Sequence, residues 1–122
     1  MTDPALYQSL TQAIGAHGAW KFRLRAAIRK GADEALVTQA GDHHGCAFGC
    51  WLDGLPDDVR LRQEASETIV RHAEFHRVAS RAAQLIKQGR IDAAQDMLEV
   101  EFTAASQALT AAVSRWRMTA SR

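Results

Sequence analysis

The feature that most constrains the fold is a series of apolar stripes at helical spacing, which runs through most of the 122 residues. Apolar residues that recur every three or four positions place one side of a helix against a core. Long stretches with this spacing cover residues 4–30, 57–87 and 91–117, and no stretch alternates apolar and polar residues as a half-buried strand does. The sequence therefore predicts an all-α fold, an antiparallel helical bundle of three long helices plus short helical segments.

Helix start and stop signals divide the chain further. Asp3 and Pro4 predict a helix start, and Gly31 predicts its end. A short helix is expected from Asp33 to Ala40, with Asp33 as its cap and Gly41 as its stop. One or two helical turns are expected from Cys46 to Leu52, after a polar loop. The next long helix is predicted to begin at Asp57 and to carry Leu61 inward.

Composition limits the organisation and the partners. Residues 1–122 are predicted to form one domain, because this length buries one core and no linker interrupts it. With 15 basic and 14 acidic residues, the chain gives no electrostatic case for binding nucleic acid. It has no apolar run of about 20 residues for direct membrane insertion and no signal peptide, so a cytoplasmic location is expected. The first residue, Met1, favours a stand-alone protein over a fragment.

Three histidines lie on the predicted inward faces. His72 and His76 are four residues apart, so they share one face of a helix, and His17 lies on the inward stripe of another helix. Such histidines can be hydrogen-bonded core residues, and the pair alone is weak evidence for a metal. Three buried neutral imidazoles, however, need partners for their ring nitrogens, and a metal ion supplies that partner.

Cys46 is the candidate fourth ligand. A free cysteine is often only a small buried hydrophobe. Here Gly45 and Gly49 bracket it in a tight segment, as expected where the backbone must bring a short side chain up to an ion. One thiolate and three imidazoles suit a tetrahedral zinc ion. Trp20 and Trp51 would then shield the site, although they are equally compatible with a simple role in the core.

The motifs formed by these residues resemble a known family. His-x-x-Trp begins at His17, Cys-x-Phe-Gly-x-Trp-Leu begins at Cys46, and His-x-x-x-His begins at His72. In this the chain resembles the chemoreceptor zinc-binding (CZB) domains of bacterial chemoreceptors and some diguanylate cyclases. The resemblance implies a helical bundle, a homodimer and a buried zinc site. It implies that the ligands are His17, Cys46, His72 and His76, with Trp20, Phe48, Gly49 and Trp51 around them.

The predicted chemistry is sensing, not catalysis. A closed four-coordinate zinc site has no open position for water or substrate, so the protein is not expected to be an enzyme. Either zinc occupancy is the signal, or zinc holds Cys46 as a thiolate that hypochlorous acid oxidises. In both cases we expect the Cys46 segment to shift against the long helices. A partner or fused module of the chemoreceptor or diguanylate cyclase type would read this shift.

Two other functions remain open from the sequence. A hemerythrin-like di-iron bundle is disfavoured, because no inward glutamate is evident. A helical dimerisation module with a purely structural metal is the second alternative.

Several residues near the motifs and at the end of the chain complete the predictions. Cys50 can be a packing residue, an alternate ligand or a resolving thiol, and its spacing from Cys46 favours packing. His43 and His44 are predicted to be solvated. Trp116 and Met118 are expected to be exposed apolar residues compatible with a dimer.

Overall fold

The structure, a computed structural model, describes residues 3–120, which fold into helices joined by short loops. Met1, on which the stand-alone prediction depended, lies outside the described residues. The all-α prediction is confirmed, because no strand occurs between residues 3 and 120. Within the same range, no helix combines the length and the apolar character that crossing a bilayer requires.

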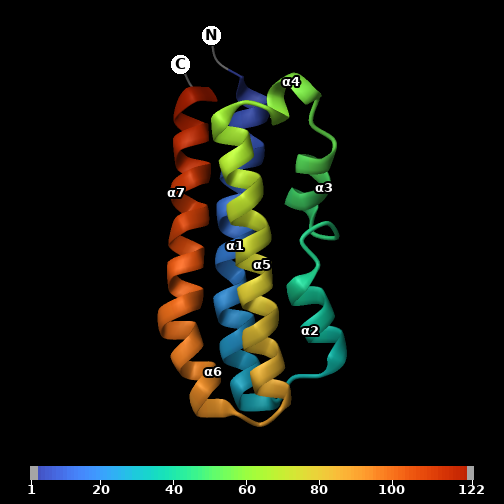
Figure 1. Ribbon diagram of the computed structural model, residues 1–122, viewed down its shortest axis with the longest axis vertical. Helices are drawn as coiled ribbons and strands as arrows, with labels where there is room; N and C mark the ends of the chain where they lie inside the picture. Colours follow the sequence, from blue (N-terminus) through green and yellow to red (C-terminus); the bar gives the residue numbers. More distant parts are fainter. Residues whose placement is uncertain (1–2, 121–122) are drawn as a thin grey trace.

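The helices form four arms that run along one long axis (Figure 1). In chain order they are α1 (Pro4–Lys30), then α2 (Glu34–Gly41) with α3 (Ala47–Asp53), then α5 (Gln63–Lys87), and finally α6 (Ile91–Met97), the π-helical segment η1 (Leu98–Phe102) and α7 (Thr103–Ala120). The short α4 (Asp57–Arg60) joins the second arm to the third. Consecutive arms run in opposite directions, so α1 and α5 are parallel to each other. The second arm is the interrupted one, and its α2–α3 loop lies about halfway along the bundle.

The helix ends follow the local chemistry of the sequence. The Asp3 carboxylate accepts a hydrogen bond from the Leu6 backbone N–H at 3.1 Å, and Asp33 caps α2 through the Leu36 N–H at 2.9 Å. Gly31, with a φ of 93°, ends α1 in a conformation that other residues rarely adopt. The predicted start and end of α1 and the predicted cap of α2 are therefore confirmed.

The prediction of one helix from Asp57 to Lys87 is wrong. The chain breaks between α4 and α5 at Arg62, whose backbone is extended (φ −67°, ψ 146°). The Arg60 side chain turns back to donate hydrogen bonds to the carbonyls of Leu52 and Asp53, which ties α4 to the end of α3. Leu61, predicted to face inward, is 81% exposed at this corner.

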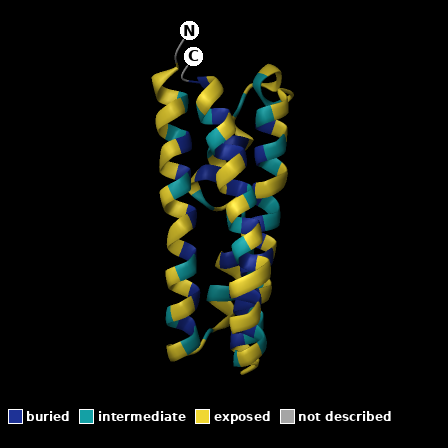
Figure 2. Ribbon diagram, turned by 90° about the vertical axis from the view of Figure 1, so that its left-hand side faces the viewer, coloured by how far each residue is buried: buried dark blue, intermediate teal, exposed yellow. Residues whose placement is uncertain are grey.

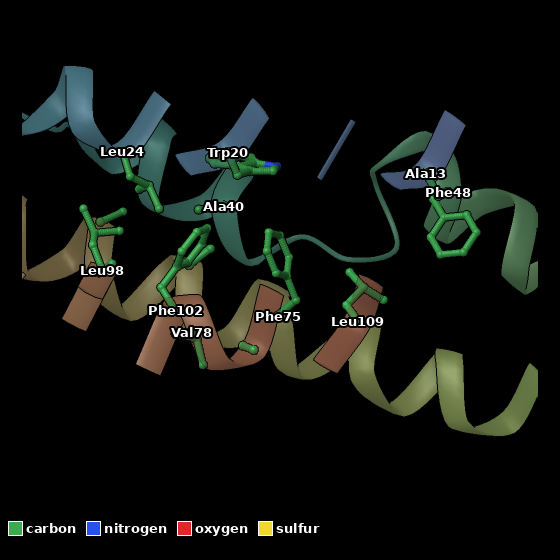
Figure 3. Close-up of a cluster of buried hydrophobic side chains, with 14 of the residues drawn as sticks. Ala13, Trp20, Leu24, Ala40, Phe48, Phe75, Val78, Leu98, Phe102 and Leu109 are labelled. Carbon is green, nitrogen blue, oxygen red and sulfur yellow. The ribbon is translucent and has the colours of Figure 1, made fainter. Parts of the chain in front are cut away.

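The core follows the predicted stripes along the arms. Buried residues line the inner side of each arm and exposed residues the outer side (Figure 2), and the close-up in Figure 3 shows aromatic and aliphatic side chains from several arms meeting between them. Trp116, predicted to be exposed, is instead buried, whereas Met118 is 59% exposed as expected.

The last arm also departs from a regular α-helix. It contains the π-helical turn η1, where the Thr103 hydroxyl donates to the Leu98 carbonyl.

Candidate metal centre

The predicted ligands come from three arms and meet in one place. Their side-chain donor atoms all lie within 4.8 Å of one another. We call this group the inner cluster, and it consists of His17 from α1, Cys46 at the N-cap of α3, and His72 and His76 from α5. Each position follows from the helix pattern, because the three histidines lie on inward stripes and the α2–α3 loop delivers the cysteine at mid-height of the bundle.

Hydrogen bonds to backbone carbonyls fix two of the histidine rings. His17 Nδ1 lies 2.8 Å from the Ala13 carbonyl oxygen, and His76 Nδ1 lies 2.8 Å from that of Ala40. A carbonyl oxygen only accepts, so each Nδ1 carries the ring proton and donates it. In the neutral rings both Nε2 atoms are then bare acceptors, although they lie only 3.2 Å apart. Two opposed lone pairs this close in a buried site repel each other, and a cation between them would replace the repulsion by attraction.

The spacing of the donor atoms fits a tetrahedral zinc ion. Zinc bonds of about 2.0–2.1 Å to nitrogen and about 2.3 Å to sulfur imply donor separations of about 3.3–3.6 Å. His72 Nε2 lies 3.0 Å from His17 Nε2 and 3.2 Å from Cys46 Sγ. Cys46 Sγ lies 3.8 Å from His17 Nε2. The residues present therefore match zinc in donor type. Four of the donor separations lie within a few tenths of an ångström of tetrahedral spacing, and all of them lie within 4.8 Å.

Burial keeps the imidazoles in the form that binds metal. The side chains of His17, His72 and His76 are 5%, 1% and 0% exposed. Loss of hydration lowers the pKa of His72 to about 3 and that of His76 to about 4, and it also lowers the pKa of His17. The neighbouring imidazoles disfavour a second positive charge and contribute to the shifts of His72 and His76. All three rings are therefore neutral near pH 7.

Cys46 is held differently, because it is only half-buried. Burial raises the pKa of its thiol, an effect opposed by hydrogen bonding to the backbone N–H of Gly49, which lies 3.3 Å from the sulfur. The same bond makes Cys46 the side-chain cap of α3. A zinc ion reverses the effect of burial, because a thiol that coordinates it loses its proton.

The residues predicted to shield the cluster divide into two layers. Phe48 meets the rings of His17 and His72 edge-on, with centroids 5.7 and 5.2 Å apart, and Trp20 lies 6.4 Å from the His76 ring. Trp51 forms an outer layer, because it stacks on Phe48 at 5.6 Å. Sequence reasoning missed Phe75, whose ring lies 5.3 Å from that of His17. Because Phe75 stands between His72 and His76 in the His-x-x-x-His motif, the sequence could have placed it near the cluster.

Gly49 is required by a close approach of two backbone segments. A Cβ atom at this position would overlap the carbonyl of His43, which lies directly against the first turn of α3. The same carbonyl accepts a contact from the Cys46 thiol at 3.7 Å. Glycine therefore lets the α2–α3 loop lie against α3 and bring the Cys46 sulfur to the histidines.

The polar residues beside the cluster differ partly from expectation. Cys50, for which a packing role was the favoured of three, is exposed, and its thiol donates to the His44 carbonyl at 3.1 Å. The helix turns Cys50 away from the cluster because Phe48, Gly49 and Leu52 occupy the buried side of α3. His44 is exposed as predicted and pairs with Asp53 at 2.8 Å, whereas His43 is half-buried.

The donor set also bears on the di-iron alternative. Within the described residues, the inner cluster contains no carboxylate. A di-iron centre in a helical bundle uses glutamate ligands and Glu-x-x-His motifs, which these faces do not present.

Comparison with known proteins gives one match. No curated protein and no solved structure matches the chain. The chemoreceptor zinc-binding domain family matches residues 17–83. This range covers more than half of the 122 residues and extends from His17 past His76, so it contains the whole inner cluster. The chain therefore belongs to the chemoreceptor zinc-binding domain family.

Proposed function

We propose that the chain binds one zinc ion through the inner cluster and acts as a sensory or regulatory domain in bacterial signalling. The observation that carries the proposal is the pair of opposed Nε2 atoms of His17 and His76, which lie 3.2 Å apart. Each ring is held in this orientation by a hydrogen bond from its Nδ1 to a backbone carbonyl. His72 and Cys46 complete a donor set whose atoms all lie within 4.8 Å of one another, with His72 Nε2 3.0 Å from His17 Nε2 and 3.2 Å from Cys46 Sγ. Membership of a zinc-binding family supports zinc over other divalent metals.

Cys46 is the residue through which an oxidant would act. Bound zinc supplies the positive charge that keeps this sulfur a thiolate near neutral pH. The thiolate then attacks hypochlorous acid, forming a sulfenic acid and releasing chloride, and the oxidised sulfur is a poorer ligand. Half-burial leaves Cys46 within reach of a small oxidant, whereas the three histidines are enclosed.

A chain of aromatic contacts offers a route from the site to the last helix. Phe48 touches two ligand rings and stacks on Trp51, with an interplanar angle of 15°. Trp51 in turn lies 5.6 Å from Trp116 of α7. A shift of α3 after loss of the zinc–sulfur bond would therefore reach α7, where a partner or a fused chemoreceptor or diguanylate cyclase module would read it.

Elemental analysis tests zinc binding and the redox response together. We expect one zinc per chain in the wild type, release of zinc after stoichiometric hypochlorous acid, and weak binding in Cys46→Ala. Cys50→Ala is the matched control and should keep its zinc. Retention of zinc after oxidation would favour a structural or zinc-level role. Absence of zinc, with no uptake on addition, would contradict the proposal.

A homodimer is part of the same proposal and follows from the family resemblance. Sedimentation of the zinc-loaded protein should give twice the mass of the 122-residue chain. If a dimer persists unchanged when zinc is removed and Cys46 is oxidised, the alternative of a dimerisation module with a structural metal gains support.

A further inference from the structure

A groove with an excess of positive charge lies between α1 and the last arm, towards the end of the bundle where α6 begins (Figure 1). It has a volume of about 400 Å³, which is within the range of small-molecule sites. None of its lining residues belongs to the inner cluster. We call it the basic groove, and it is lined by Lys21, Arg25, Ile28 and Arg29 from α1 and by Gln95, Leu98 and Glu99 from the last arm.

The three cations of the basic groove form a row along α1. Lys21, Arg25 and Arg29 follow one another at intervals of four residues, so each stands about one helical turn from the next. Like charges at this spacing destabilise a helix. Arg29 lies in the last turn, where a cation meets the negative end of the helix dipole, but Lys21 and Arg25 lie further inside α1. The dipole therefore does not account for the row.

No acidic side chain neutralises this row. Within residues 3–120, every ion pair uses other side chains than Lys21, Arg25 and Arg29. Glu99 is the only acidic residue among those that line the groove, and its carboxylate forms no ion pair with the row on the opposite wall. Three cations against one carboxylate leave a local excess of two positive charges. An anion in the groove would relieve their mutual repulsion.

The wall opposite α1 is the irregular part of the last arm. Leu98 and Glu99 begin the π-helical turn η1, and turns of this kind are rare in proteins and frequent at functional sites. Phe102, the last residue of the turn, is buried, and its ring lies 5.2 Å from that of Phe75. This wall of the groove is therefore anchored in the core of the bundle.

We propose that the basic groove binds a small molecule that carries a chain of phosphates. Arginine matches phosphate oxygens with two parallel hydrogen bonds, and lysine adds a compact positive charge. The row from Lys21 to Arg29 spans about 12 Å along the helix. This length suits an anion with several charges in a line better than a single phosphate. The inference does not depend on zinc binding by the inner cluster.

Two larger occupants fit the groove less well. An acidic helix of a partner protein needs an apolar surface to anchor it, but Ile28 is half-buried and Leu98 is only 4% exposed. A single-stranded nucleic acid stacks its bases on aromatic side chains, and none of the described residues that line the groove is aromatic. A compact polyanion needs only the cations, which the groove offers.

Titration of the full chain with inorganic tripolyphosphate, followed by backbone amide NMR signals, tests the proposal. We expect the signals of residues 21–29 and 95–99 to shift, because these segments form the two walls. Arg25→Gln and Arg29→Gln should each weaken binding by at least about tenfold, since each removes hydrogen bonds to a charged group. Glutamine forms helices nearly as well as arginine, so α1 should persist in both variants. Arg62→Gln, an exposed arginine at the α4–α5 corner, is the matched control and should bind like the wild type.

Glu99→Gln gives a second measurement of opposite sign. It removes the one carboxylate that repels a phosphate chain in the groove, so binding of tripolyphosphate should become tighter. A purely structural role of these residues does not predict a gain. Titration with adenosine triphosphate distinguishes the source of the phosphates: tighter binding than that of tripolyphosphate would indicate a nucleotide, and weaker binding a free phosphate chain.

Three results would overturn the proposal. One is the absence of any shift in the wild type, and another is a set of shifts spread over exposed cations outside the basic groove. The third is an equal loss of affinity in Arg62→Gln and Arg25→Gln, which would mean a general attraction of the anion to basic side chains. Zinc content is measured before and after each titration, because phosphate chains can also remove a bound metal.

Discussion

At the scale of single residues, two backbone carbonyls decide the chemistry of the site. Ala13 and Ala40 each accept the Nδ1 proton of a histidine, so the Nε2 atoms of His17 and His76 face inward without protons. Metal-binding histidines are commonly oriented in this way by a partner behind the ring. Ala13 precedes His17 by one helical turn, but Ala40 comes from another arm, so its carbonyl fixes His76 only through the tertiary fold.

Replacing the sulfur ligand should weaken binding without unfolding the bundle. In Cys46→Ser a hydroxyl, which does not deprotonate readily, replaces a thiolate, and we expect the zinc dissociation constant to rise by at least about 100-fold, the upper range for losing a supporting contact. Competition with a chelator measures it, with Cys50→Ser as the control. Equal affinities in the two variants would show that Cys46 is not a ligand.

Gly49 should not tolerate even one added methyl group. Gly49→Ala would force α3 away from the His43 carbonyl, and overpacking of this kind costs about 1–3 kcal/mol. We expect a lower melting temperature and weaker zinc binding. Gly54→Ala is the matched control, because a Cβ there meets its nearest neighbour at an ordinary 3.6 Å. If the two variants have the same melting temperature, the close approach between Gly49 and the His43 carbonyl contributes little to stability.

At the scale of elements, we expect α3 to be the part of the fold that depends most on a bound zinc ion. It has seven residues, which is too short for an isolated helix to persist in water. Phe48 and Leu52 anchor it by burial, and Cys46 would anchor it through zinc. The long helices α1, α5 and α7 instead bury continuous stripes against each other.

Removal of zinc should therefore loosen one element selectively. We expect backbone amides in residues 42–54 to exchange hydrogen faster in the metal-free protein, while those in the middle of α5 stay protected. Hydrogen exchange followed by mass spectrometry of peptides from both regions measures this difference. Uniform loss of protection across the chain would instead mean that zinc supports the whole bundle.

The sequence predicted elements better than it predicted their junctions. Helical periodicity located α1 and all but the start of α5, cap and stop residues located α2, and spacing within motifs located the inner cluster. The break at Arg62 escaped because Leu61 continued the apolar pattern, while the reason for the break lies in Arg60 bonds to α3. The exposure of Cys50 and the burial of Trp116 likewise depend on contacts between arms, which a one-dimensional pattern does not contain.

At the scale of the whole molecule, the bundle combines an apolar core with a polar site at its centre. Buried aliphatic and aromatic side chains occur along α1 on both sides of His17 and along α5 on both sides of the His72–His76 pair, so we expect the metal-free protein to remain folded. It then holds three neutral imidazoles in a place where a proton is disfavoured. The stability of the metal-free protein should therefore depend on pH.

The direction of this pH dependence follows from proton uptake by the histidines. An unfolded histidine binds a proton below about pH 6.5, whereas folded His72 and His76 resist protonation until about pH 3 and about pH 4. Between these limits the unfolded chain holds more protons, so stability is fully present above pH 6.5 and falls as the pH drops. Each such histidine contributes a slope of about 1.4 kcal/mol per pH unit.

Urea unfolding of the metal-free protein at several pH values from 7.5 to 5 checks this prediction. His72→Leu keeps an apolar side chain in place of one titrating ring, so its stability should change less steeply with pH than that of the wild type. Equal slopes in the two proteins would mean that His72 is protonated as easily in the fold as in the unfolded chain. The neutral, lone-pair-bearing donor set required for zinc would then not be preformed.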